Sequence, residues 1–108
     1  METFFDDILK CCKKEIEDQN YLIEQQVPTA IIRLCKALFI KAMTIIARDD
    51  WGAENAKEVI NEMYRIKDNN PSPECDRMIE AAHKYWSAVY DPYEFSKDEH
   101  LIGATPQE

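Results

Sequence analysis

The sequence predicts an all-α fold, a four-helix bundle-like single domain spanning residues 1–108. Apolar residues recur at three- and four-residue spacing along most of the chain, which is the period of amphipathic helices. Prolines and polar loop residues divide the chain into four such runs, and no run shows the alternation of a strand. A chain of this length buries roughly 60 to 70% of its unfolded surface, enough for one core. We expect residues 104–108 to form a frayed tail.

The first predicted helix spans about 3–26, with Asn20 as a candidate break. Its apolar stripe is Phe4, Phe5, Ile8, Leu9, Cys12, Ile16 and Ile23. The second helix is predicted over 28–48, with Pro28 in its first turn, where the missing N–H of proline has no partner to lose. Two long helices joined by so few residues normally lie antiparallel, so we expect a helical hairpin.

Residues 28–48 combine high hydrophobicity with a basic stripe and no acidic residue, in a chain of net charge −8. The stripe consists of Arg33, Lys36, Lys41 and Arg48. With 100° per residue, the polar positions occupy one arc of about 140°, and apolar residues fill most of the rest. This pattern predicts the central helix of the bundle. The stripe either faces carboxylates on neighbouring helices or stays exposed for an acidic partner.

The third and fourth helices are predicted over about 51–68 and 73–90. Asp49 and Asp50 end the second helix and supply an N-cap for the third. The prolines at 71 and 73 mark a loop, and Ser72 followed by Pro73 is typical of an N-cap and first helical residue. Ser96 and Glu99 have the spacing of a capping box, which predicts a short C-terminal helix near 97–102.

The cysteines are predicted to be reduced thiols in a cytoplasmic protein. Cys12, Cys35 and Cys75 lie on the apolar faces of predicted helices, where free cysteine behaves as a small hydrophobic residue. The adjacent Cys11 and Cys12 cannot form an ordinary disulfide with each other, and no histidine accompanies them as in a zinc site. We therefore expect no metal.

Composition also narrows the class of partner. With 21 acidic against 13 basic residues, the chain is expected to repel nucleic acid and anionic membranes. Two glycines are too few for a phosphate-binding loop, so no cofactor is expected. Catalytic constellations are scarce, which favours a role other than an enzyme.

Two groups of residues are candidate partner-binding surfaces. The first is an acidic ridge on the third predicted helix, where glutamates recur every four residues at Glu54, Glu58 and Glu62. The alternative interpretation of this pattern is a solvent-exposed helix face without a partner. Aromatic residues gather near the end of the chain and at the start of the third helix, and such residues fill either interfaces or cores. The aromatic candidates are Trp51, Tyr90, Tyr93 and Phe95.

Arg77 and His83 have the Arg-x5-His spacing, which resembles the motif of HEPN ribonuclease domains. That family is small, all-helical and usually dimeric. The resemblance implies that the arginine and histidine of two chains meet in one cleft and cut RNA. The alternative is a surface arginine and a histidine at the edge of the apolar stripe.

Three functional hypotheses follow. The first is a small acidic protein-interaction module, such as an inhibitor, immunity or anti-defence protein that binds a basic protein surface. The second is a homodimeric helical scaffold subunit of a larger assembly, because a four-helix monomer does not fully cover the wide apolar face of residues 28–48. The third is a HEPN-like ribonuclease that uses Arg77 and His83.

Overall fold

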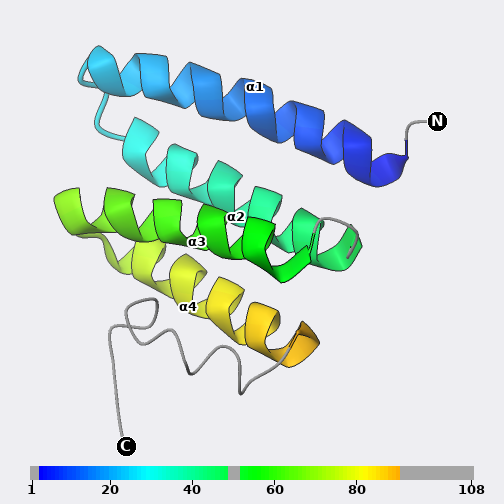
Figure 1. Cartoon of the computed structure of the whole chain (residues 1–108). Coiled ribbons are helices and arrows are strands. Elements are labelled where there is room, and N and C mark those ends of the chain that lie inside the picture. Colours follow the sequence, from blue (N-terminus) through cyan, green and yellow to red (C-terminus); the bar gives the residue numbers. More distant parts are fainter. Residues whose placement is uncertain (1–2, 49–51, 91–108) are drawn as a thin grey trace, which may run out of the picture.

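The computed structural model describes residues 3–48 and 52–90, and it confirms the all-α, four-helix bundle-like fold. The helices are α1 (Phe4–Glu24), α2 (Ala30–Arg48), α3 (Gly52–Asn69) and α4 (Pro73–Val89) (Figure 1). Their ends lie within two residues of the predicted ones. The short helix expected near 97–102 and the tail at 104–108 lie outside the described residues.

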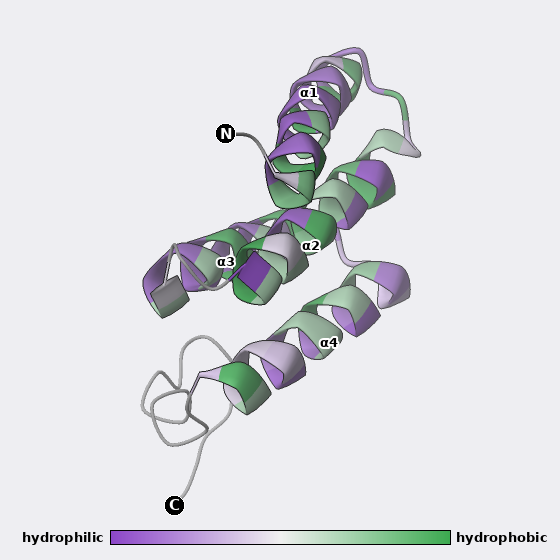
Figure 2. Ribbon diagram, turned by 90° about the vertical axis from the view of Figure 1, so that its right-hand side faces the viewer, coloured by the Kyte–Doolittle hydropathy of each residue, from purple (hydrophilic) through white to green (hydrophobic). Residues whose placement is uncertain are grey.

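α2 is the central helix, as its hydrophobicity predicts. It packs against each of the other three helices, and α3 also packs against α4. In two views at right angles, α1 lies on the opposite side of α2 from α4 (Figures 1 and 2). The antiparallel hairpin of α1 and α2 is therefore attached to an α3–α4 pair through α2.

Defined caps close both ends of α1. Thr3 is the N-cap of a capping box, in which its hydroxyl accepts from the Asp6 N–H and its own N–H donates to Asp6 Oδ2 at 2.9 Å. The helix ends in a Schellman motif, where Gln26 has a positive φ of 63° and the Val27 N–H donates to the Leu22 carbonyl at 3.0 Å. The Gln26 N–H donates to the Ile23 carbonyl at 2.9 Å as the second bond of this motif.

Two details of the predicted hairpin are wrong. Asn20 does not interrupt α1, because Ile16 and Ile23 pack against the core on either side of it and this burial outweighs a weak helix propensity. Pro28 is not in the first turn of α2. It lies in a separate turn, which the Ala30 N–H closes by donating to the Val27 carbonyl at 3.1 Å.

The start of α4 confirms its predicted cap. Ser72 is extended, its hydroxyl accepts from the Cys75 N–H at 3.4 Å, and Pro73 is the first helical residue. The caps of α1 and α4 therefore both use side chains that the sequence places directly before the helix.

The main core lies among α2, α3 and α4. Its largest fully buried side chain is that of Trp86, whose indole N–H donates to the Ala53 carbonyl at 2.9 Å and so ties α4 to the start of α3. Leu9, Ile16 and Ile23 of α1 contact this core from one side. The buried members from the three core helices are Leu34, Cys35, Leu38, Ala42, Ile45, Ile46, Ala56, Val59, Ile60, Met63, Cys75, Ile79, Ala82 and Trp86.

Candidate functional site

An open groove of about 550 Å³ runs between α1 and α2. Its residues recur three or four positions apart on each helix, so each set forms one ridge. On α1 the ridge extends from Phe4 to Glu15, a length of about 16 Å at the rise of an α-helix. We call this feature the α1–α2 groove; it is lined by Phe4, Asp7, Ile8, Cys11, Cys12, Glu15, Arg33, Lys36, Ala37 and Ile40.

The floor of the α1–α2 groove is apolar and accessible. Cys12 and Ala37 are buried, but the Phe4 side chain is 71% exposed and that of Ile40 is 41% exposed. These are two of the large hydrophobic residues that the described part of the chain leaves open to solvent. Apolar surface of this kind, rimmed by charges, is typical of a contact surface.

The two walls of the groove carry opposite charges. Asp7 and Glu15 are exposed on α1, and Arg33 and Lys36 are exposed on α2. Among the described residues, no ion pair joins the two walls, and Glu15 instead accepts a hydrogen bond from Gln19 Nε2 at 2.9 Å. The side chains of both walls therefore remain accessible to a partner.

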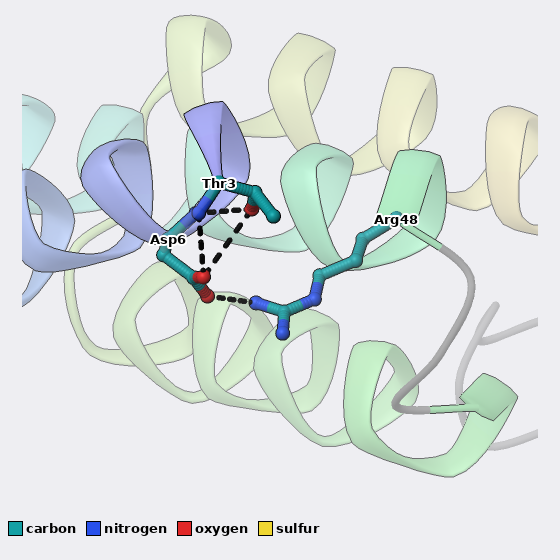
Figure 3. Close-up of polar contacts among 3 residues, drawn as sticks. All are labelled: Thr3, Asp6 and Arg48. Atoms are coloured by element: carbon teal, nitrogen blue, oxygen red, sulfur yellow. Dashed lines mark hydrogen bonds and ion pairs between the residues drawn. The ribbon is translucent and has the colours of Figure 1, made fainter. Parts of the chain in front are cut away.

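Among the described residues, Arg48 is the member of the basic stripe that forms an ion pair with an acid. Its guanidinium forms an ion pair with Asp6, which brings the end of α2 onto the start of α1 (Figure 3). The hydrogen bond from the Thr3 N–H, together with Arg48, holds the pKa of Asp6 below its ordinary value of 3.8. The expectation that the stripe faces carboxylates on neighbouring helices is thus correct for this member.

The four stripe residues consequently separate into three environments. Arg33 and Lys36 line the α1–α2 groove, and Arg48 is held by Asp6. Lys41 lies half-buried in a second groove of about 540 Å³, which Glu58 and Glu62 of α3 also line. Only Arg33 and Lys36 are exposed, so they are the members of the stripe that can meet an external acid.

The acidic ridge of α3 is at the surface. Glu54, Glu58 and Glu62 are all exposed, as their four-residue spacing predicts. Glu62 pairs with Arg65 in the same helix, and Glu54 lies 3.8 Å from Lys57 Nζ. In these pairs the Glu54 and Glu62 side chains stay 84% and 48% exposed, so the ridge keeps its carboxylates accessible.

The lysine beside the ridge is mostly covered. The Lys57 side chain is only 12% exposed, and its ammonium lies 4.9 Å from the centre of the Trp86 ring. Packing over an aromatic face holds this cation against the protein. The outward charge of this part of α3 is therefore dominated by the glutamates.

Of the aromatic candidates, the structure describes one. Tyr90 is half-buried and its ring centre lies 5.6 Å from that of Trp86, so it packs at the end of the core. Trp51, Tyr93 and Phe95 lie outside the described residues.

The structure places Arg77 and His83 in different environments. Arg77 is exposed on α4. His83, expected at the edge of the apolar stripe, is buried, and its ring meets the Tyr64 ring edge-on with centres 5.0 Å apart. A single chain thus exposes one residue of the Arg-x5-His pair and covers the other.

The groove contains residues that sequence reasoning did not single out. Phe4 and Ile8 follow the apolar stripe of α1 and were expected to face the core. Ile40 gave a usable signal, because at 100° per residue it lies between Lys36 and Arg33 inside the polar arc of α2. An isoleucine in that arc points to an apolar patch on an otherwise basic face.

These helices define a small acidic all-α protein with two candidate contact surfaces, the α1–α2 groove and the acidic ridge of α3. No protein-family model, no curated protein and no solved structure matches the chain. Within residues 3–48 and 52–90, no helix is long and apolar enough to cross a membrane. The same residues contain no group of three or more His, Cys, Asp or Glu side chains placed to hold a metal ion.

Proposed function

We propose that this protein is an interaction module that binds a basic protein surface through the acidic ridge of α3. The observation that carries the proposal is the exposure of Glu54, Glu58 and Glu62 on one helix of a chain with net charge −8. Complementary charge accelerates encounter and selects among partners, even where it adds little to final affinity.

Basic protein surfaces often serve to bind nucleic acid, because they neutralise phosphates. A ridge of carboxylates competes for such a surface. In its most specific form, the proposal is an inhibitor, immunity or anti-defence protein that covers the nucleic-acid-binding face of its target. A cytoplasmic setting agrees with the four free cysteines, since thiols stay reduced there.

The test is a pull-down from nuclease-treated lysate of the native host, at low and moderate salt, with three baits. The first bait is the wild-type protein, and the second carries Glu54→Lys, Glu58→Lys and Glu62→Lys. The third is a matched control with the same change of net charge on exposed acids of α1. Its substitutions are Glu17→Lys, Asp18→Lys and Glu24→Lys.

The proposal predicts one basic protein, retained in stoichiometric amount by the wild type and by the α1 control. The ridge variant and higher salt should both release it. Equal retention by the ridge variant and the control would contradict the proposal. Cleavage of RNA by the purified chain, abolished by Arg77→Ala, would favour the HEPN-like alternative instead.

A further inference from the structure

We propose that the α1–α2 groove is the contact surface of a symmetric homodimer, in which α1 of each copy lies against α2 of the other. This inference concerns a different surface from the ridge of α3. It needs only the described geometry of the groove.

The first argument is uncovered apolar surface on the central helix. α2 packs against three helices and still exposes Ile40 on the groove side. Across the groove, α1 presents Phe4, which is 71% exposed, and the half-buried Ile8. A second helical hairpin placed on the groove would remove this surface from water, which is the main driving force of helix association.

The second argument selects the occupant. The α1 wall bears Asp7 and Glu15, and the α2 wall bears Arg33 and Lys36. A purely acidic partner is repelled by the first wall, and a purely basic partner by the second. The groove therefore fits a surface with both signs side by side, and the same face of a second copy is such a surface.

Symmetry brings the opposite charges together. A two-fold axis parallel to the groove places α1 of one copy over α2 of its partner, so the acidic wall of each copy meets the basic wall of the other. An axis across the groove would instead place acid on acid. The favoured arrangement is a four-helix bundle formed by two hairpins.

The antiparallel course of the hairpin sets which residues meet. Asp6 and Arg48 mark one end of α1 and α2, and Glu15 and Arg33 are the groove residues nearest the opposite end on their respective helices. Rotation about an axis parallel to the groove leaves heights along it unchanged. The rotation therefore brings Glu15 to the same end of the groove as Arg33 and Lys36 of the partner subunit, so an acidic and a basic wall meet there twice in the dimer.

The test measures solution mass by light scattering or sedimentation over a wide range of concentration. The wild type should approach twice the chain mass of 12.7 kDa as concentration rises. Arg33→Glu creates two like-charge contacts and should raise the dimer dissociation constant at least about tenfold. The matched control is Arg77→Glu, which reverses another exposed arginine outside the groove and should leave the constant unchanged.

A second pair of variants tests the apolar floor. Ile40→Ser should weaken the dimer about tenfold or more, because it removes buried apolar surface from both copies. Ile32→Ser is the control, since Ile32 is similarly exposed at 38% on α2 but does not line the groove. Circular dichroism should show all four variants folded, because each altered side chain is exposed in the monomer.

Three outcomes would overturn the inference. The first is a wild-type protein that stays monomeric at all concentrations. The second is a dimer dissociation constant that a groove variant and its control raise equally. The third is a dissociation constant that neither Arg33→Glu nor Ile40→Ser changes. Because these measurements use the purified chain alone, they fail or succeed independently of the lysate experiment on the α3 ridge.

Discussion

The four thiols of this chain differ because the helices place them differently. Cys12, Cys35 and Cys75 are buried, whereas Cys11 is exposed. Burial raises the pKa of Cys12. Burial, with a hydrogen bond to Cys75, raises the pKa of Cys35 to about 12. Because the thiolate is the reactive form, Cys12 and Cys35 should be inert at neutral pH, and complete burial shields Cys75 from reagents.

This difference predicts selective alkylation. A maleimide added to dilute native protein at neutral pH should add rapidly to Cys11 alone, whereas the denatured chain should take up four equivalents. Intact mass spectrometry counts the adducts. Cys11→Ser is the control and should stay unmodified. A rapid second adduct on the native protein would show that one of the inner thiols is accessible.

At the scale of elements, helix ends were predictable where a side chain makes the cap. Ser72 and Pro73 mark the start of α4 in the sequence, and the structure confirms both roles. The end of α1 was less accessible to prediction, because its left-handed position holds Gln26 where glycine is the common choice. Backbone hydrogen bonds and packing, which leave no residue signature, place that turn.

The contact between Asp6 at the start of α1 and Arg48 at the end of α2 makes the free energy of unfolding depend on pH in the acidic range. The pKa of Asp6 is lowered from 3.8 in the folded protein, so its ionised form stabilises the fold. That contribution is fully present above 3.8, the pKa of Asp6 in the unfolded chain. It is lost as the pH falls through the lower pKa of Asp6 in the folded protein. Chemical denaturation at a series of acidic pH values measures it.

The variant for this measurement is Asp6→Asn, which keeps an oxygen to accept from the Thr3 N–H but removes the charge and replaces the oxygen that accepts from Arg48 by an amide NH2 group. We expect its free energy of unfolding to fall less steeply than that of the wild type below pH 3.8. Arg48→Gln removes the cation instead and should weaken the same dependence. If the free energy of unfolding of both variants depended on pH as that of the wild type does, the Asp6–Arg48 contact would not contribute to acid stability.

At the scale of the whole molecule, α2 organises both the core and the proposed interface. Its buried side joins α3 and α4, and its exposed side forms one wall of the α1–α2 groove. The central position of α2 could be predicted from its high hydrophobicity and from the helical spacing of its apolar residues. The groove as a whole could not, because its place depends on how three neighbours share the circumference of α2; the local pattern offers only the signal of Ile40 in the polar arc.

The central role of α2 predicts unequal effects of truncation along it. Leu38 is 5% exposed in the core, so Leu38→Ala should lower the free energy of unfolding by about 2 to 5 kcal/mol. Ile32→Ala, on the exposed side, should cost under about 1 kcal/mol. Denaturant titrations of the two variants compare them. Equal losses would mean that α2 is not buried as described.

The most direct measurement of the symmetric interface mixes two charge-reversed proteins. Arg33→Glu has acids on both walls toward the Glu15 end of the groove, and Glu15→Arg has bases on both, so each should be monomeric alone. Mixed in equal amounts, they should form a heterodimer of twice the 12.7 kDa chain mass, because the acidic walls of one protein then meet the basic walls of the other. A mixture that remains monomeric while the wild type dimerises would contradict the proposed pairing.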